Sequence, residues 1–383
     1  MKKILIFLIL TYLSLTINSV SKAQAKNILE IGVLLPLSGE FKYIGDSFLK
    51  AIQLGLHDIS NKNIKIYPKD SKANAIDAYK AVKEFEEKGI KIVIGPIFFK
   101  SLEKLNDFNN ITFISFTNKT DQISNNIISF GININSQISV IEEYFNKNSI
   151  SKTLLLSPKS EFMNQTKKIE KSKIKFYKTF KYNTSAKKIT GEVEKLTKYQ
   201  ERKKDLERRI NILEKSDLYK DKQELKKLEQ MHTLGKVNFD SIIVLDFGER
   251  LKSVLTSFIF SDVSSKKIKF FTINQWFDET FFNESALENL HFPAVNLGNF
   301  KKFNKKFSAT FNEKANQVAI LAYDALGLIY YCWYNNDFVF EKNQLYSKKG
   351  FKGLHGNFII KNNLAEQKLK IYKVSRKKFI EVY

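Results

Sequence analysis

Four short loops carry the side chains of this sequence that are best suited to hold a ligand. They cover residues 36–39, 95–99, 115–118 and 274–276, and each follows an apolar run typical of a β-strand. The loops offer hydroxyls, amides, aromatic rings and the free N–H groups of helix starts, which can hold an anion or a carboxylate. Any one of them is also typical of a helix cap or a turn. Because they coincide at strand ends, they predict one binding site, with the candidate residues Ser38, Gly39, Phe98, Phe99, Ser115, Thr117, Asn118, Asn274 and Trp276.

Residue patterns for catalysis or metal binding are weak in this sequence. None of the histidines has a second histidine at i+3 or i+4, or a nearby cysteine, which argues against a zinc site; they are His57, His232, His291 and His355. The G-x-S-x-G, P-loop and G-x-G-x-x-G motifs are absent. The stretch GLHGNF at 353–358 precedes a strand, so we interpret it as a turn. We therefore expect no catalytic residue, no metal and no cofactor. An enzyme acting on cell-wall fragments is a third alternative, after the two given below.

Alternating strands and helices must position the four loops. Buried-strand runs at 31–35, 64–70, 90–95 and 111–116 alternate with helical patterns at 44–59 and 74–89. The pattern restarts with a helix at 136–147 and strands at 152–158, 240–247 and 267–274. Strands separated by such helices indicate parallel βαβ units. Two α/β halves of this kind predict two lobes, with the strand ends facing the crevice between them.

A charged helical segment at 187–233 interrupts the second half. It has no proline, and its only glycine is Gly191. Thin apolar stripes on both sides of a break at Ser216-Asp217 predict two antiparallel helices that form a projecting arm. Such an arm is either a solvated hairpin or a docking arm for a partner protein, and the sequence leaves both interpretations open.

The first 25 residues have the pattern of a secretory signal peptide. Lys2 and Lys3 precede an apolar run at 4–15, and Ala23-Gln24-Ala25 is a small-x-small cleavage site. No other run reaches the roughly 18 apolar residues that a spanning helix needs. We expect a protein secreted to the periplasm, cleaved after about Ala25, with no stable membrane anchor.

The sole cysteine and the net charge limit the possible disulfides and binding partners. Cys332 lies in an apolar helical run far from the leader, so we expect a buried side chain, no disulfide and no lipid attachment there. The net charge is +23, and the leader accounts for three of these charges. Such charge is typical of proteins that bind nucleic acid or anionic surfaces, and secretion argues against nucleic acid. It reflects either a compositional bias toward lysine or a role near an anionic envelope polymer or membrane face.

Several stretches resemble one known family. The opening IGVLLPLSGEFKYIGDSFLKAIQLGL resembles type 1 periplasmic solute-binding proteins of the leucine/isoleucine/valine-binding type, and KIVIGPIFFKSL and TFISFTN resemble their next two cleft loops. Within that superfamily the sequence is most similar to penicillin-binding protein activators. The similarity continues in HTLGKVNFDSIIVLDFGERLKSV, AILAYDALGL and GFKGLHGNF, and in the helical arm placed before the first of these.

The resemblance implies an α/β fold of two Rossmann-like lobes joined by three crossovers, with the arm inserted in the second lobe. It places lobe 1 at 26–133 and about 290–337, and lobe 2 at 134–289 and about 338–383. It also implies that Phe162 is the aromatic side chain that closes over a ligand. The chain departs from amino-acid binders where Phe98, Phe99 and Lys119 replace small or hydroxylated residues.

Two functions follow from the resemblance. The first is a non-catalytic periplasmic regulator that activates a peptidoglycan synthase, a penicillin-binding protein, by contact through the arm or the cleft rim. The second is the substrate-binding subunit of an ABC importer for branched-chain amino acids or another small polar solute, with an ABC permease as its partner.

Overall fold

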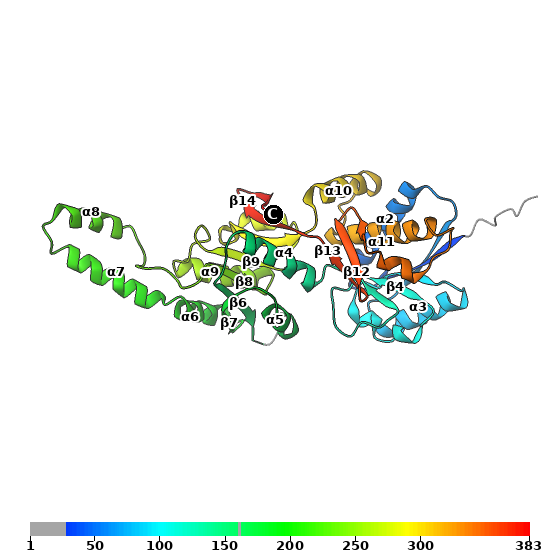
Figure 1. The fold of residues 1–383 in the computed structure, drawn as a ribbon, viewed down its shortest axis with the longest axis horizontal. Coiled ribbons are helices and arrows are strands. Elements are labelled where there is room, and N and C mark those ends of the chain that lie inside the picture. Colours follow the sequence, from blue (N-terminus) through cyan, green and yellow to red (C-terminus); the bar gives the residue numbers. More distant parts are fainter. Residues whose placement is uncertain (1–27, 160–161) are drawn as a thin grey trace, which may run out of the picture.

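The computed structural model describes residues 28–159 and 162–383, so the predicted signal peptide at 1–25 lies outside the described residues. The described chain forms two α/β lobes arranged end to end, and a helical arm projects from the far side of the second lobe (Figure 1). This arrangement confirms the predicted two-lobed fold with an inserted arm. Among the described helices, none combines the length and the apolar character needed to cross a membrane.

Lobe 1 is built on an eight-stranded sheet with the strand order β11-β12-β13-β5-β4-β3-β1-β2. Its parallel strands are β1 (Leu29–Leu35), β2 (Ile64–Asp70), β3 (Ile92–Ile94), β4 (Thr112–Ser115) and β5 (Ile127–Ser129). The strands β11 (Phe351–Lys352), β12 (Asn357–Lys361) and β13 (Leu364–Gln367) complete it; they pair with one another antiparallel, and β13 lies parallel to β5. The helices of lobe 1 are α2 (Lys42–Ile59), α3 (Ala75–Glu87) and α11 (Ile320–Tyr334), with the 3-10 helices η1 (Phe99–Leu102), η2 (Leu105–Asp107), η5 (Gln317–Ala319) and η6 (Lys342–Tyr346).

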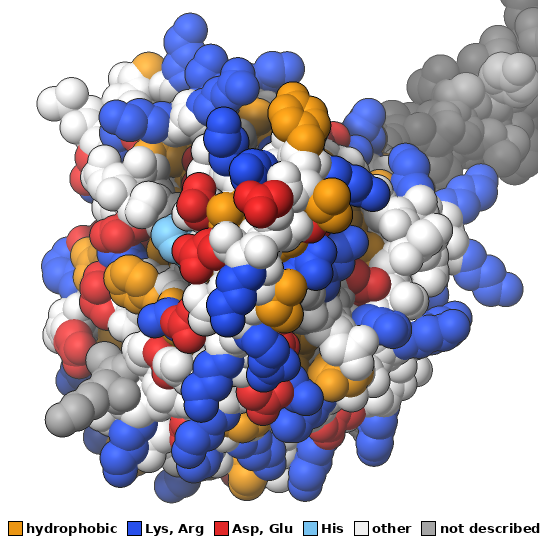
Figure 2. All heavy atoms as spheres, turned by 90° about the vertical axis from the view of Figure 1, so that its left-hand side faces the viewer, with side chains coloured by type: hydrophobic (Ala, Val, Ile, Leu, Met, Phe, Trp, Pro, Cys, Tyr) orange, Lys and Arg blue, Asp and Glu red, His pale blue; other side chains and the backbone are white. Residues whose placement is uncertain are grey.

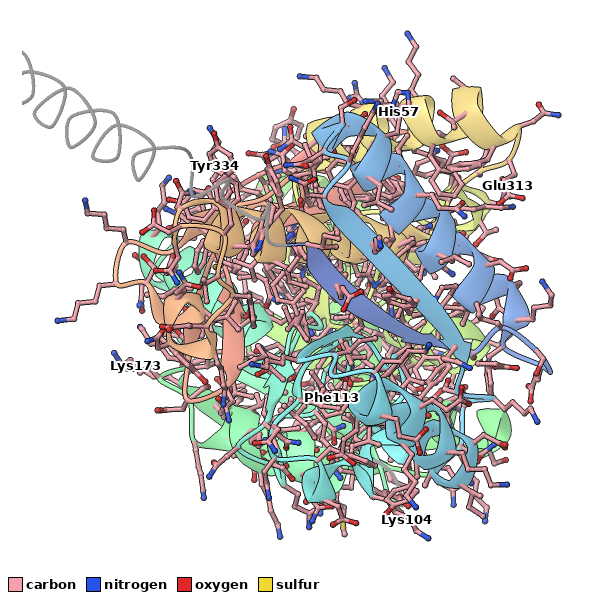
Figure 3. All side chains as sticks on the ribbon, turned by 90° about the vertical axis from the view of Figure 1, so that its right-hand side faces the viewer. His57, Lys104, Phe113, Lys173, Glu313 and Tyr334 are labelled. Atoms are coloured by element: carbon pink, nitrogen blue, oxygen red, sulfur yellow. The ribbon has the colours of Figure 1, made fainter. Side chains whose placement is uncertain are left out.

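Both faces of this sheet are buried, as its uninterrupted apolar strands predict. In β1, Val33 belongs to the core under α2 and α11, whereas the next residue, Leu34, belongs to a second core under α3. Phe113 of β4 lies in that second core, and Figure 3 shows it in the interior of lobe 1. Successive side chains of a strand point to opposite faces, so one apolar strand supplies both cores.

The first turn of α2 approaches the end of β1 so closely that only glycine fits at position 45. A Cβ atom on Gly45 would lie 1.9 Å from the carbonyl oxygen of Pro36. This contact holds the loop after β1 against the helix, and thereby sets where the first of the four predicted loops lies.

Lobe 2 is built on a seven-stranded sheet with the order β15-β14-β10-β9-β8-β6-β7. Its strands are β6 (Thr153–Pro158), β7 (Phe176–Tyr182), β8 (Ser241–Val244), β9 (Lys269–Thr272), β10 (Leu290–Ala294), β14 (Lys370–Ser375) and β15 (Lys378–Glu381). The helices of lobe 2 are α4 (Ile134–Lys147), α5 (Met163–Glu170), α6 (Ala186–Leu196) and α9 (Gly248–Phe260), with η3 (Glu279–Asn283) and η4 (Ser285–Leu287).

The lobe boundaries differ from the predicted ones in the C-terminal third. Strand β10 pairs with β9 and β14, so the chain is still in lobe 2 at position 290. Strands β11 to β13 extend the sheet of lobe 1, so residues 351–367 do not belong to lobe 2. The backbone N–H of Ser129 donates to the carbonyl of Asn363 at 2.8 Å and joins this hairpin to β5. A short strand pattern does not reveal which sheet it joins, because that depends on a partner more than 200 residues away in the sequence.

The chain passes between the lobes three times, as the resemblance implies. The first passage leads from β5 to α4, and the third leads from β13 to β14. The second passage includes α10 (Leu297–Phe311), which contacts both lobes. The ring of Phe300 lies 5.7 Å from that of Phe277 in lobe 2, and the ring of Phe303 lies 5.9 Å from that of Tyr323 in lobe 1.

A buried polar cluster ties the first and third passages together. The side chain of Gln367 donates to the carbonyl of Phe130 at 3.0 Å, and its backbone N–H donates to the hydroxyl of Ser136 at 2.9 Å. Asn133 donates to the carbonyl of Ala365 at 2.6 Å. Because these groups are buried and hydrogen-bonded, the two segments are held side by side at the junction of the lobes.

The arm consists of α7 (Tyr199–Leu213) and α8 (Tyr219–Leu228), which is shorter than the predicted 187–233. Helix α6 instead packs on lobe 2, where Ile189 and Val193 are buried in its core. The expected break near Ser216 is present between α7 and α8. The arm has a small apolar cluster of its own around Leu206, Leu213 and Leu228. The apolar periodicity of residues 187–233 could not distinguish a helix that packs on lobe 2 from a helix that projects away from it.

One buried arginine joins the arm to lobe 2. The Arg202 guanidinium donates to the carbonyl of Thr197 at 3.0 Å, the hydroxyl of Thr233 at 3.0 Å and the carbonyl of Ser261 at 2.6 Å. Burial lowers the pKa of this guanidinium below its ordinary value, and the nearby Asp262 carboxylate opposes that shift. Since its three acceptors come from three segments, Arg202 sets the angle at which α7 leaves the lobe.

Candidate functional site

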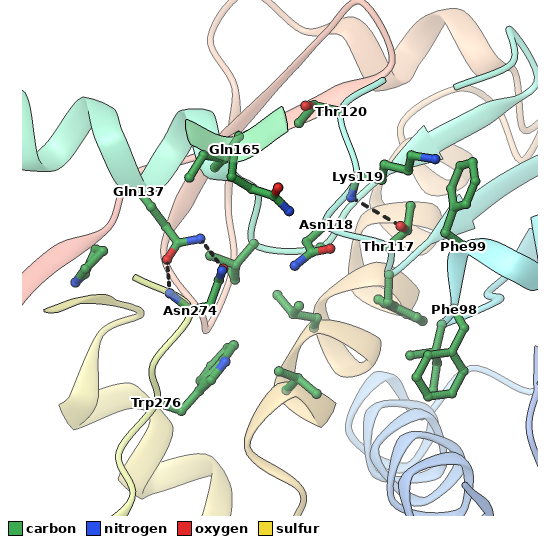
Figure 4. Close-up of a pocket in the computed structure, with 18 of the residues that line it drawn as sticks. Phe98, Phe99, Thr117, Asn118, Lys119, Thr120, Gln137, Gln165, Asn274 and Trp276 are labelled. Carbon is green, nitrogen blue, oxygen red and sulfur yellow. Dashed lines mark hydrogen bonds between the residues drawn. The ribbon is translucent and has the colours of Figure 1, made fainter. Parts of the chain in front are cut away.

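A cavity of about 530 Å³ lies between the two lobes (Figure 4). Lobe 1 contributes the loops after β3 and β4, and lobe 2 contributes the first turn of α4, part of α5 and the loop after β9. These are carboxyl ends of parallel strands and the helix turns beside them, where open α/β sheets bind ligands.

Six of the ten predicted site residues line this cavity. They are Phe98, Phe99, Thr117, Asn118, Asn274 and Trp276. The loops that carry them are far apart in the sequence and meet only because the lobes face each other. Their binding of a ligand stays a prediction.

Ser38 and Gly39 lie outside the lining of the cavity. Ser38 hydrogen-bonds to Asp70 at the end of β2, together with the backbone N–H of Leu37 at 2.8 Å. Burial raises the pKa of Asp70, but hydrogen bonds from Ser38, Lys72 and Leu37 outweigh it, so that the pKa lies below its ordinary value. Gly39 is exposed with a φ of +74°. This loop is therefore a turn closed by hydrogen bonds to Asp70. A turn was the alternative to a ligand-binding loop that the sequence left open.

Ser115 and Phe162 also lie outside the lining. The Ser115 hydroxyl is fully buried and donates to the carbonyl of Pro96 at 2.8 Å, which ties together the two lobe-1 loops. Phe162 precedes α5 with a φ of +59°, and its ring lies 6.2 Å from that of Phe247 in an edge-on arrangement. Neither side chain contacts the cavity as expected, because each has a structural partner nearby.

Aromatic side chains form much of the lobe-1 wall. The ring of Phe98 lies 4.6 Å from that of Phe41 at the start of α2. The ammonium group of Lys119 lies 3.4 Å from the centre of the Phe99 ring, a cation–π contact. Two of the residues that depart from the amino-acid binders, Phe99 and Lys119, are therefore in contact with each other on this wall.

A pair of amides on the lobe-2 wall was not predicted. The side chain of Gln137 donates to Oδ1 of Asn274 at 2.8 Å, and the backbone N–H of Asn274 donates back to Oε1 of Gln137 at 2.6 Å (Figure 4). Gln137 lies in the first turn of α4 among buried residues such as Ile134 and Ile138. A glutamine on that apolar helix face was the signal available in the sequence.

Other amides around the cavity remain available to a ligand. In the described part of the chain, the side chains of Asn118, Asn164 and Gln165 have no hydrogen-bond partner, and all three line the cavity. Figure 4 shows the side chains of Asn118, from the lobe-1 loop, and Gln165, from α5 of lobe 2, near each other. A polar ligand between the lobes can therefore accept from and donate to both at once.

A polar contact across the mouth of the cavity joins the lobes directly. Lys168 of α5 hydrogen-bonds to Thr120 and forms an ion pair with Asp121, both in the loop after β4. The side chains of Lys168 and Asp121 are 31% and 39% exposed. The pair is too accessible to water to add much stability, but it spans the two lobes.

Two buried titratable side chains away from the cavity have structural roles, His355 and Cys332. The buried His355 ring lies 2.5 Å from Asp324, which also accepts from the backbone N–H of His355 at 2.7 Å and of Leu354 at 2.8 Å. This pair closes the predicted turn at 353–358 against α11. Burial raises the pKa of the Cys332 thiol to about 12, so it is a neutral core side chain. Within residues 28–159 and 162–383, no three His, Cys, Asp or Glu side chains are grouped to hold a metal.

Comparison with known proteins gives one family and one fold. A family model described as "LppC putative lipoprotein" matches residues 10–237, more than half of the chain. No protein of curated description matches the sequence.

Among solved structures, the C-domain of LpoA from Haemophilus influenzae, described as a regulator of PBP1A, is 13% identical with a TM-score of 0.61, over 92% of this chain and 100% of that domain. A putative branched-chain amino acid ABC transporter protein from Rhodospirillum rubrum is 12% identical with a TM-score of 0.70, over 93% and 100%. The binding protein LivJ from Streptococcus pneumoniae, solved with isoleucine, is 16% identical with a TM-score of 0.56, over 92% and 99%. These similarities confirm the type 1 periplasmic binding protein fold.

Proposed function

This chain belongs to the family of LppC putative lipoproteins, and from that premise we propose that it is a non-catalytic regulator that activates a peptidoglycan synthase by direct contact. The similarity to the LpoA C-domain, described as a regulator of PBP1A, supports the assignment, since it extends over the whole of that domain. We further propose that the protein acts in the periplasmic envelope. The leader predicted to take it there lies outside the described residues.

The observation that carries the proposal is an anchored arm with an apolar tip. Arg202 ties the base of α7 to lobe 2 through three hydrogen bonds, and Arg209 pairs with Glu224 through two bonds of 2.9 Å between α7 and α8. At the tip, Leu218 and Tyr219 are 67% and 77% exposed. A hairpin held this firmly has lost its conformational freedom before it meets a partner, which lowers the entropic cost of docking.

Exposed leucine and tyrosine at the end of a projection fit a contact with another protein. Tyrosine is one of the residue types that often dominate the binding energy of protein interfaces, and the exposed Leu218 beside it enlarges the apolar surface of the tip. Leu218 and Tyr219 take no part in the Leu206 cluster that holds the two helices of the arm together. Substitutions there therefore test binding without weakening the fold.

The test pairs a tip variant with a matched control on the same hairpin. The tip variant is Leu218→Ser with Tyr219→Ser, and the control is Gln223→Ser with Lys226→Ser, two exposed positions on α8. The measurements are affinity for the peptidoglycan synthase of the same cell and its glycan polymerisation rate. We expect the wild type to raise the rate, the tip variant to bind at least about tenfold more weakly, and the control to match the wild type.

Two outcomes separate the parts of this proposal. A polymerisation rate that the wild-type protein leaves unchanged refutes the function. A rate that rises equally with the tip variant refutes the role of the arm and moves the contact to the cleft rim.

The inter-lobe cavity favours a second candidate function, the binding of a small polar solute for an ABC importer. Here Thr117, Asn118, Asn274 and Trp276 would contact the solute, and the three passages between the lobes would allow them to close. Lys119 is held on Phe99 and Lys168 by Asp121, so neither cation is free to pair with an amino-acid carboxylate. An uncharged polar solute fits this wall better.

A thermal-shift screen decides between the candidates. A solute at one hundred times its Kd stabilises the folded protein by about 2.7 kcal/mol, and Asn118→Ala should remove that gain. If neither amino acids nor neutral sugars raise the melting temperature, the solute-binding function is refuted and the regulator remains.

A further inference from the structure

A dense row of lysines lies along one edge of lobe 2. Between Thr166 and Lys188 the sequence has nine lysines and one acidic residue, Glu170. Six of them have exposed side chains without an ion-pair partner in the described part of the chain, and we call them the basic edge: Lys167, Lys171, Lys173, Lys175, Lys178 and Lys181. Lys168 is excluded, because it pairs with Asp121.

These lysines come from three consecutive segments. They lie on α5, on the turn after it and on β7, the outermost strand of the lobe-2 sheet. Figure 2 faces the arm end of the molecule and shows Lys and Arg side chains gathered along its lower side, where α5, β7 and α6 lie in Figure 1. In Figure 3, Lys173 is at the outer edge of the molecule.

Protection of a sheet edge accounts for only part of this row. Lysines on an edge strand discourage pairing with another chain, which explains Lys178 and Lys181. The lysines of α5 and of the turn at 171–175 lie outside the strand and protect no edge. One acid approaches the turn, since the Glu142 carboxylate accepts the backbone N–H of Lys173 at 2.7 Å, but among the described residues it pairs with no ammonium group. The excess charge is therefore uncompensated.

We propose that the basic edge binds a linear phosphate polymer. Side chains at odd and even positions of a strand point to opposite faces of the sheet. Lys178 and Lys181 therefore lie on opposite faces, and both can be reached only from the edge of the strand. A polymer lying along that edge meets lysines from both faces, whereas a flat membrane meets those of one face. From Lys175 to Lys181 the edge extends about 20 Å at 3.3 Å per residue, enough for several repeats of a chain.

The chemistry of the edge favours phosphate. All six cations are lysines, which bind phosphate as point charges, and no arginine fork is present to select planar carboxylates. Because β7 is the edge strand of the described sheet, backbone N–H groups along its outer edge can also donate to phosphate oxygens. A membrane would need several apolar anchors, and the large apolar side chains exposed on α5 and β7 are Met163 and Tyr177 alone.

The test uses the full chain and long-chain polyphosphate, with binding measured by calorimetry at several salt concentrations. The edge variant carries Lys171→Gln, Lys173→Gln, Lys175→Gln and Lys178→Gln. The control variant removes the same charge at four exposed lysines elsewhere, with Lys301→Gln, Lys302→Gln, Lys305→Gln and Lys349→Gln. Since all eight side chains are exposed, both variants should unfold at the wild-type temperature.

For six contacts to a flexible polyanion, the logarithm of the binding constant should fall with the logarithm of the salt concentration at a slope of about −4. In the edge variant, which loses four of the contacts, this slope should be less steep by about 3. At 0.1 M salt the edge variant should then bind at least about 100-fold more weakly, and the control within about threefold of the wild type. Equal losses in the two variants would refute a localised site. Equal or tighter binding to polyglutamate, or to vesicles of anionic phospholipid, would also overturn the proposal, in favour of a carboxylate polymer or a membrane. These measurements do not involve the synthase.

Discussion

Replacing Arg202 should release the arm while leaving the two lobes folded. The substitution Arg202→Met keeps the length of the side chain and removes its donors to Thr197, Thr233 and Ser261. A matched control is Arg208→Met on the same helix, where the arginine is 73% exposed. The pair separates loss of the buried anchor from loss of an arginine as such.

The size of the effect follows from the hydrogen bonds. Each bond from a charged donor contributes about 1.5–3 kcal/mol, so three give a gross loss of about 4.5 kcal/mol or more. Water entering the vacated space offsets part of this, which leaves about 3 kcal/mol. The loss applies to local opening, because the leucine cluster of the arm is separate from the core of the lobes. A change of 3 kcal/mol shifts an equilibrium by a factor of about 150.

Amide hydrogen exchange measures this opening directly. We expect exchange in α7 and α8 to accelerate about 150-fold in Arg202→Met, because helices of this length are marginal without packing. Exchange in β6 and β8 should stay at the wild-type rate in both variants. Equal acceleration in Arg208→Met, or loss of protection in β6 and β8 together with the arm, would show that Arg202 does not anchor the arm.

Three further changes test other parts of the structure. Gly45→Ala places a methyl group against the Pro36 carbonyl and should cost about 3 kcal/mol in urea unfolding, whereas Gly191→Ala, with open space around it, should not destabilise the protein. Burial lowers the pKa of His291 to about 4, so the unfolded chain binds the extra proton; stability should be full above pH 6.5 and fall by about 3 kcal/mol toward pH 4, and His291→Phe should flatten that pH profile. Lys168→Ala removes the contact with Asp121 across the cavity and should increase the radius of gyration in X-ray scattering while changing unfolding by less than about 1 kcal/mol; an unchanged radius would show that the ion pair does not restrain the lobes.

Repeating patterns in the sequence were sufficient to predict the fold. The apolar run before Pro36 and the helical spacing after it reflect the faces that β1 and α2 bury. The buried face of a segment can be identified from its own residues, because the apolar residues recur with the period of the strand or the helix. The loops after β3, β4 and β9 were identified for the same reason, because a loop between an apolar strand and a helix lies at a sheet end wherever the sheet is. The membership in the LppC family agrees with this prediction.

Contacts between distant segments were decided only by the tertiary structure. Ser38 has the residue type of a ligand contact, yet Asp70 from the next strand takes its hydrogen bond. The acceptors of Arg202 extend to Ser261, and the partner of Gln137 is Asn274. A side chain shows in the sequence what it can bind, but which groups come within 3 Å of it depends on the path of the whole chain. The local patterns of strands and helices in the sequence therefore determined the two-lobed fold. The packing of distant segments determined which side chains form the walls of the cavity and which residue anchors the arm.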